Sequence, residues 1–297
     1  MKIRFAIAPA GRFDVTDYVT LVSELEGLGF DTIWLSDVPL GDSIEPIVGL
    51  GWAAAATTKL KLGANVVPVG RNPMQLARQL AQLDRLSNGR VLLSLVPGVD
   101  QPGERAALGV GKIDRGLLIE EVMGLLRRWW AGEKLDYRSE RYDFQGIEVM
   151  PTPKQNPLEL WLGGNGPKAL DRAGRLSDGW LGAFATPVEA GEARRTMQQV
   201  AVDHGRHIDD EHFGLSLGYA HADIPEPTFT MMKRRRVNQA DVPASDLVPV
   251  GAAGLRDLIS RHIDNGISKF VLRPIDRTAS WHDELSWLAD TVLPMQT

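Results

Sequence analysis

Residues 60–96 read LKLGANVVPVGRNPMQLARQLAQLDRLSNGRVLLSLV, in which two short apolar runs flank a segment with helical spacing. The apolar run Leu60–Val67 predicts a buried strand. Pro73–Leu86 then repeats apolar residues at helical spacing and has a proline in its first turn, which predicts a helix. A second apolar run follows at Val91–Val96. Strand, helix and strand in this order predict two parallel strands joined by a crossover helix.

The same alternation continues on both sides of this stretch. The further strands are expected at Ile3–Ala8, Thr32–Leu35, Leu158–Leu162, Gly179–Phe184, Phe213–Ala220 and Lys269–Arg273. The further helices are expected at Thr16–Leu28, Pro46–Thr57, Arg115–Trp130, Pro167–Gly174, Pro187–His204, Leu255–Asn265 and Trp281–Leu293. About eight strand–helix units close a β/α barrel, so we expect one (β/α)8 TIM barrel over residues 1–297. A doubly wound open sheet is the alternative, although it usually has fewer units at this length.

Three segments depart from the alternation. Val96–Asp114 and Ile224–Val250 follow expected strands, so they are expected as insertion loops at the C-terminal face of the barrel, where barrel enzymes place their sites. Within the second loop, the basic run Lys233–Arg236 is expected to be a solvated helix face. In Glu133–Met150 polar and aromatic residues alternate, which suggests an excursion from the barrel or a hairpin.

Composition excludes several classes of function. The net charge of −5 gives no basic footprint for nucleic acid. The absence of cysteine excludes disulfides, thiolate nucleophiles and cysteine zinc sites, and it fits a reducing cytoplasm. No apolar run approaches the roughly 20 residues of a membrane helix, and the first residues read as a strand rather than a signal peptide, so no membrane partner is expected.

Histidine and lysine are informative by their positions. No histidine precedes His204, so the first six strands supply no imidazole to the barrel mouth. His204 and His207 lie at a helix end among aspartates, where a hydrated loop is favoured over a metal site. His221 closes a strand and is a candidate for the catalytic face, with a hydrogen-bonded loop histidine as the alternative. The lysines Lys59, Lys61 and Lys269 lie at strand beginnings, which disfavours a Schiff-base aldolase.

The sharpest local motif is a glycine-rich turn between a strand and a helix. The expected strand runs directly into Gly163-Gly164-Asn165-Gly166, and Pro167 opens the helix. Glycines let the backbone approach an anion, and a helix N-terminus offers free N–H groups with partial positive charge. The turn is therefore favoured as a phosphate site over a plain tight turn.

The residues now resemble a known family. Gly29–Asp37, read as GFDTIWLSD, is similar to a segment of the luciferase-like flavin- and F420-dependent oxidoreductases. Further matching segments follow in the family's order: Leu62–Gly63, Pro68, Arg71–Pro73, Leu83–Arg90, Ala107–Gly109, Trp161–Asn165 and Ser177–Leu181. Together they cover roughly residues 1–185 and are specific as a set.

The resemblance implies a β/α barrel that binds coenzyme F420 or reduced FMN. It implies a bulge in the third strand, often with a non-proline cis peptide behind the cofactor ring, and this position corresponds to Asn65–Val66. Gly163, Gly164 and Asn165 correspond to the cofactor phosphate or ribityl site. Gly182 and Ala183, which end the next strand, are expected to contribute to the same site.

Two departures from the family concern proton transfer. Val38 stands where the family has a histidine after Ser-Asp, and Asn72 replaces the histidine of its Arg-His-Pro. Asp37, which is also a candidate cofactor ligand, and Glu104 in the first loop remain as candidate catalytic acids or bases, and His221 is the reserve. Structural carboxylates that cap loops are the alternative for both acids.

The leading hypothesis is an F420-dependent oxidoreductase that acts on an unidentified small organic molecule. The alternatives are an FMN-dependent monooxygenase working with a separate reductase, a barrel that binds a flavin-like ligand without turnover, and, more distantly, a phosphosugar isomerase. The resemblance also implies a homodimer, for which Pro46–Thr57 and Pro73–Leu86 could supply a shared face.

Overall fold

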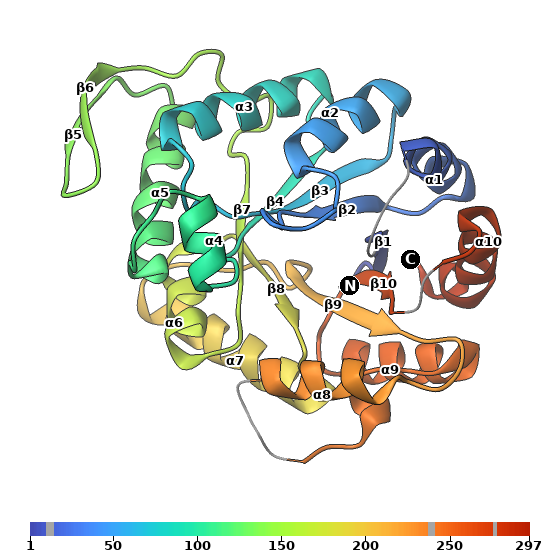
Figure 1. Cartoon of the computed structure of the whole chain (residues 1–297). Coiled ribbons are helices and arrows are strands. Elements are labelled where there is room, and N and C mark those ends of the chain that lie inside the picture. Colours follow the sequence, from blue (N-terminus) through green and yellow to red (C-terminus); the bar gives the residue numbers. More distant parts are fainter. Residues whose placement is uncertain (10–14, 237–240, 276–277) are drawn as a thin grey trace.

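The computed structural model describes residues 1–9, 15–236, 241–275 and 278–297. Within them, parallel strands close a barrel in the order β1-β10-β9-β8-β7-β4-β3-β2 (Figure 1). These strands are β1 (Arg4–Ile7), β2 (Thr32–Ser36), β3 (Lys61–Val66), β4 (Val91–Leu95), β7 (Leu160–Gly163), β8 (Gly179–Ala183), β9 (Phe213–Tyr219) and β10 (Lys269–Pro274). The barrel prediction is confirmed, and the open sheet is ruled out because β1 pairs with both β2 and β10.

Helices surround the strands on the outside of the barrel (Figure 1). They are α1 (Val15–Leu28), α2 (Pro46–Ala56), α3 (Pro73–Leu86), α4 (Pro102–Ala107), α5 (Arg115–Trp130), α6 (Pro167–Leu176), α7 (Pro187–Asp203), α8 (Glu226–Arg235), α9 (Gly251–Asp264) and α10 (Trp281–Val292). Local chemistry sets where they begin: at α3 the side chain of Asn72 accepts the N–H groups of Met74 and Gln75, and Pro73 follows the cap. Short 3-10 turns occupy Ala244–Asp246 and Leu293–Met295.

The excursion is an antiparallel hairpin of β5 (Leu135–Arg138) and β6 (Asp143–Ile147). It projects from the barrel beside α3 and α5 (Figure 1). Trp129 of α5 packs edge-on against Phe144 of β6 at 5.3 Å and donates its indole N–H to the carbonyl of Ile147. The hairpin is thus anchored to the outer helices, away from the barrel mouth.

The barrel wall separates two apolar layers. The large outer layer lies between strands and helices, and its largest fully buried residues include Phe5, Phe213 and Phe270. A smaller inner layer fills the barrel with Trp34, Trp161, Ala6, Ala8, Leu181 and Val271. Glycines make room for the two indoles, because a Cβ on Gly63 would lie 2.1 Å from the Trp34 ring and one on Gly179 would lie 2.5 Å from Trp161. This layer closes the barrel interior below the C-terminal ends of the strands, which are called its upper end here.

The lower end of the barrel is tied by charges. Lys269 Nζ lies 2.9 Å from Asp31 Oδ2, and Lys61 Nζ lies 3.6 Å from Asp31 Oδ1. Burial alone would raise the pKa of Asp31, but the charges of Lys269 and Lys61 outweigh it and lower the pKa. A polar depression of about 370 Å³ also lies at this end. Lys61 and Lys269 therefore serve the stability face, as predicted from their positions at strand beginnings.

The two long loops carry short helices. Val96–Asp114 contains α4, and Ile224–Val250 contains α8, although residues 237–240 of that loop lie outside the described part. The basic run is in part the solvated helix face that was expected, because Arg234 and Arg235 are exposed on α8. Arg236 is instead buried against Glu189 at 2.7 Å, and Arg235 also borders a cavity. Among the described helices, none is long and apolar enough to span a membrane.

Candidate functional site

Polar side chains line the upper end of the barrel interior on three neighbouring strands. Ser36 of β2, Asn65 of β3 and Ser94 of β4 stand in register with one another. Each lies two residues beyond an inner-layer position, so all three face the barrel interior. Asn65 Nδ2 donates to Ser36 Oγ at 3.1 Å. Within the described residues, Asn65 Oδ1 and Ser94 Oγ are buried without a hydrogen-bond partner, which is uncommon for structural polar groups and typical of a ligand site.

The expected cis peptide between Asn65 and Val66 was wrong. The cis bonds in the described residues are Met150–Pro151 and Asn156–Pro157, so the Asn65–Val66 bond is trans. The backbone is regular here, because β3 pairs without a shift with β2 up to Asn65 and with β4 up to Val66. The carbonyl of Asn65 accepts the N–H of Asp37, and that of Val66 accepts the N–H of Val96. These bonds occupy the wall where a bulge was expected.

Asp37 follows β2 at the rim and is held by an arginine. Its Oδ2 accepts Arg71 Nη2 at 2.8 Å and the backbone N–H of Val67 at 3.1 Å. Arg71 also contacts Glu45 at 3.0 Å. Burial alone would lower the pKa of Arg71, but hydrogen bonds and charges from Asp37 and Glu45 outweigh it and raise the pKa. Asp37 therefore fixes the rim of the barrel between β2 and β3.

Glu104 of α4 is likewise committed to an arginine. Its Oε1 lies 2.6 Å from Arg115 Nη1, and both side chains are buried. The second oxygen accepts the N–H of Val99, and Arg115 also donates to the carbonyl of Pro97. The pair fastens α4 to the start of α5 and shapes the first loop.

The glycine turn borders a cavity of about 380 Å³ at the end of β7. Gly164 has φ +107°, a conformation that side chains other than glycine rarely adopt. The N-cap residue of α6, Gly166, has no side chain, Pro167 has no N–H, and the N–H of Ala169 donates to the carbonyl of Gly166, so Lys168 supplies the first-turn N–H that is left for a ligand.

The charged side chains around this cavity are of both signs. Lys168 and Arg172 of α6 line it together with Asp114, and Arg172 Nε donates to Glu120 at 3.0 Å. The N–H and the ammonium group of Lys168 at the helix N-terminus are the part of the lining that suits phosphate.

Asn165, Gly182 and Ala183 have different places. The Asn165 amide donates to the carbonyl of Ala183, which ties the turn to β8. Ala183 also lines a second cavity. Gly182 faces the other way, because a Cβ there would lie 2.2 Å from Trp180, a residue of the outer layer. Gly182 is therefore not brought together with the other predicted cofactor residues.

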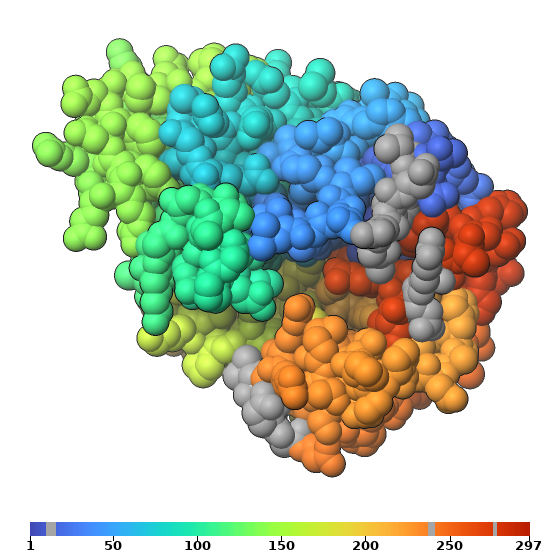
Figure 2. Space-filling view, viewed as in Figure 1, coloured from blue at the N-terminus to red at the C-terminus, as the bar shows by residue number. Residues whose placement is uncertain are grey.

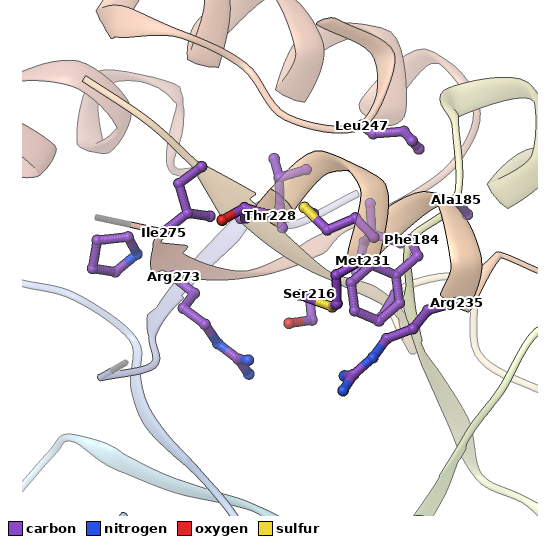
Figure 3. A pocket seen from close by; sticks show the side chains of 15 residues that line it. Phe184, Ala185, Ser216, Thr228, Met231, Arg235, Leu247, Arg273 and Ile275 are labelled. Atoms are coloured by element: carbon purple, nitrogen blue, oxygen red, sulfur yellow. The ribbon is translucent and has the colours of Figure 1, made fainter. Parts of the chain in front are cut away.

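The second cavity, of about 290 Å³, lies over the ends of β8, β9 and β10 and beneath α8. Figure 3 shows Ser216, Arg235 and Arg273 directed into it. Figure 2 shows this face of the molecule hollowed between the orange of α8 and the blue and green segments opposite. The expected pocket at the strand C-terminal ends is thus confirmed.

Sequence reasoning missed Ser216, Arg235 and Arg273 because it weighed only histidines, lysines and carboxylates at the barrel mouth. Arg273 does end the strand Lys269–Pro274. The same rule that selected His221 would have found it, since residues at the C-terminal ends of barrel strands face the site.

His221 lies apart from both cavities. Its Nε2 is 3.0 Å from Glu284 of α10, and its ring packs 4.3 Å from Trp287. Tyr219 donates to the same carboxylate at 2.6 Å, and burial, followed by the charge of Glu284, raises the pKa of Tyr219. His221 thus joins a cluster between β9 and α10. No group of acidic or histidine residues among the described positions is arranged to hold a metal ion, and this includes His204 and His207.

This chain is similar to known proteins. The family model for luciferase-like monooxygenases matches residues 4–229. An F420-dependent glucose-6-phosphate dehydrogenase of Kineococcus radiotolerans is 29% identical over 185 residues, which cover 59% of this chain and 54% of that protein. An FMNH(2)-dependent dimethylsulfone monooxygenase of Pseudomonas fluorescens is 34% identical over 143 residues, which cover 47% of this chain and 38% of that protein. The matched stretch therefore spans about half or less of these curated relatives.

A solved structure resembles the whole chain. The coenzyme F420-dependent tetrahydromethanopterin reductase of Methanopyrus kandleri superposes with a TM-score of 0.80 over 100% of both chains. Its sequence identity is 17%, so this likeness concerns the fold alone.

Proposed function

The chain belongs to the luciferase-like monooxygenase family, and from this premise we propose that it is an oxidoreductase that transfers a hydride between coenzyme F420 and a small organic substrate. Its relatives include both F420-dependent dehydrogenases and FMNH(2)-dependent monooxygenases. The observation that supports a phosphorylated, flavin-like cofactor is the cavity at the glycine turn, which suits phosphate. The choice of F420 rather than FMN goes beyond this observation.

The residues present fit such a cofactor at two points. The glycine turn packs closely against the protein, since a Cβ on Gly163 would lie 3.1 Å from Val96 and one on Gly164 would lie 3.0 Å from Ala169. The N–H and the ammonium group of Lys168, at the start of α6, would hold the phosphate, and Arg172 would add positive charge while it remains paired with Glu120. Asn65 and Ser94 would offer their unpartnered oxygens to the polar edge of the ring system.

When bound, the deazaflavin supplies the hydride chemistry itself, so the protein needs only to bind, orient and shield the reactants. We assign Asp37 and Glu104 to positioning. Each carboxylate is paired with an arginine, Asp37 with Arg71 at 2.8 Å and Glu104 with Arg115 at 2.6 Å, and these pairs fix the rim and the first loop. In this proposal no proton transfer is assigned to either carboxylate or to His221, which lines neither cavity.

An FMN-dependent monooxygenase remains the second candidate, because one relative of that kind is 34% identical. FMN also ends in a phosphate, so the glycine turn suits both cofactors. Such an enzyme would need a separate reductase to supply reduced FMN. A barrel that binds either cofactor without turnover is the third.

Titration of the pure full chain with F420 and with FMN, followed by quenching of cofactor fluorescence, tests the proposal. We expect saturable binding of F420 with at least tenfold higher affinity than FMN. Tight binding of FMN with none of F420 would transfer the proposal to the monooxygenase. Failure of both to bind would remove the cofactor proposal altogether.

A further inference from the structure

Among the described residues, Arg273 is a cation without an anionic partner. It comes two residues after Val271 of the inner layer, so its side chain points into the barrel mouth. Its Nε is buried with no hydrogen-bond partner, and within the described part of the chain no carboxylate pairs with its guanidinium. Burial, and then the positive charge of Arg235, lower the pKa of Arg273. A buried charge in this state is costly, so the position suggests a partner that arrives from outside.

A second guanidinium faces the same cavity. Arg235 ends α8, where its guanidinium lies 5.8 Å from the centre of the Phe184 ring. No acidic side chain of the described residues pairs with it or is found in the cavity lining. Figure 3 shows Arg235, Arg273 and the hydroxyl of Ser216 converging on the same space. Two guanidiniums and a hydroxyl without a carboxylate make a local anion site.

The rest of the cavity is apolar. Its other walls include Leu215, Met231, Met232, Leu247 and Ile275. The volume of about 290 Å³ lies at the small end of the range for small-molecule sites, roughly 300–1,000 Å³. Apolar walls with one charged corner recognise a short apolar body that carries a single anionic group.

The geometry points to a substrate subsite: we propose that Arg273, Arg235 and Ser216 bind the anionic head group, a carboxylate or phosphate, of a small substrate whose apolar body lies beneath α8. This inference rests on the proposed function for the identity of the ligand as substrate. It is physically separate from the glycine turn, because the two cavities have no lining residue in common. The cofactor phosphate and the substrate anion would thus occupy different cation sets.

The probes are octanoate, octyl phosphate and the neutral octanamide, measured by isothermal titration against the full chain. We expect octanoate or octyl phosphate to bind at least tenfold more tightly than octanamide, and this preference should weaken at high salt. The stronger of the two anions identifies the head group. Equal binding of all three by the wild-type chain would overturn the proposal.

The variants separate the site from general effects. Arg273→Met keeps a long side chain without the charge and should abolish the preference for the anion, whereas Arg273→Lys should keep part of it. Arg235→Met, at an exposed position, should reduce the preference several-fold and keeps the test valid if the Arg273 variants do not fold. Arg234→Met is the matched control on the same helix, because Arg234 does not line the cavity. Retained preference in folded Arg273→Met and Arg235→Met would contradict the proposal.

Titration of the same variants with F420 separates the two proposals. Unchanged F420 affinity in Arg273→Met supports a substrate site, and an equal loss of F420 and octanoate binding would assign the cations to the cofactor and overturn the inference. If octanoate binds but neither F420 nor FMN does, the anion site stands and the proposed oxidoreductase fails. If F420 binds but neither octanoate nor octyl phosphate does, the proposed oxidoreductase stands and the anion site fails.

Discussion

His262 of α9 is a fully buried imidazole without a hydrogen-bond partner in the described structure. Burial, aided by the charge of Arg261 and opposed by Asp246, lowers its pKa from 6.5 to about 4. It packs beside Phe270 of the outer apolar layer, with ring centres 6.4 Å apart. The side chain thus belongs to the core and is neutral at neutral pH.

This burial predicts a pH dependence of stability. Between pH 6.5 and 4 the unfolded chain binds a proton at His262 more readily than the folded chain does. The free energy of unfolding should therefore fall as pH is lowered through this window, by roughly 3 kcal/mol at most from this group. Urea unfolding of wild type and His262→Phe at pH 7 and pH 4.5 measures it.

The variant should lose this component of the pH dependence, and the exposed His207→Gln should keep it. A wild-type slope that persists unchanged in His262→Phe would refute the assignment. Hydrogen bonds from residues 58–60 outweigh the effect of burial and lower the pKa of Glu26 from 4.5 to about 2. Protonation of Glu26 therefore lowers the free energy of unfolding mainly below pH 4.5.

For single residues, the sequence indicated which acids lie at the barrel mouth, but not which arginines they pair with. Asp37 and Glu104 were found from their places in the chain, whereas the pairing of Asp37 with Arg71 joins residues 34 positions apart. Such contacts depend on the closed barrel and cannot be deduced from local pattern. Arg273 was missed for a different reason: an arginine becomes notable only when its lack of a partner is visible.

At the scale of elements, α4 shows how a short helix is held in a loop. It is six residues long, well below the length at which an isolated helix is stable in water. The buried pair of Glu104 and Arg115 supplies the tertiary contact that it needs. The first loop should therefore depend on this pair for its shape.

Glu104→Ala should lower the free energy of unfolding by about 3 kcal/mol, because Arg115 would remain buried without its partner. The control is Glu133→Ala, which breaks the exposed pair with Arg128 and should cost less than about 1 kcal/mol. Urea denaturation compares the two variants. Equal, small effects would show that the buried pair does not hold the loop.

The regular helices and strands were predictable because their signals are local. Pro73, Pro167 and Pro187 mark helix starts, and the apolar runs match the observed strands within a few residues. The regular path of β3 was not predicted from the family resemblance. Its ladder partners on both sides, which only the barrel brings together, pair with it without a bulge, and the Asn65–Val66 bond has the trans form that non-proline residues ordinarily adopt.

At the scale of the molecule, the count of strand–helix units sufficed for the closed barrel, but the lining of its mouth did not follow from any count. Ser216, Arg235 and Arg273 come from β9, α8 and β10. Only their packing shows that they share one cavity. The fold was thus largely predictable and the substrate side of the site was not.

The homodimer expected from the family resemblance can be tested on α2. Val48 is 72% exposed and Trp52 is 40% exposed on this helix, which suits a shared apolar face. We predict that Val48→Glu shifts the chain from dimer to monomer in light scattering at micromolar concentration. Val188→Glu, at a residue 60% exposed on α7, is the matched control and should leave the dimer intact. A wild-type monomer would contradict the prediction.

If a phosphorylated deazaflavin is held at the glycine turn, fluorescence titration with F420 of the wild type, Gly164→Val and Gly205→Val should show it. A side chain at Gly164 meets a strained φ of +107° and Ala169, whereas one at Gly205 meets a strained φ of +66° in open space away from this cavity. The strain of roughly 1–3 kcal/mol is below the stability of a typical domain, so both variants should fold, as circular dichroism can verify. We predict saturable binding by the wild type and Gly205→Val and at least tenfold weaker binding by Gly164→Val. Unchanged F420 affinity in a folded Gly164→Val variant would show that the cofactor is not held at the glycine turn.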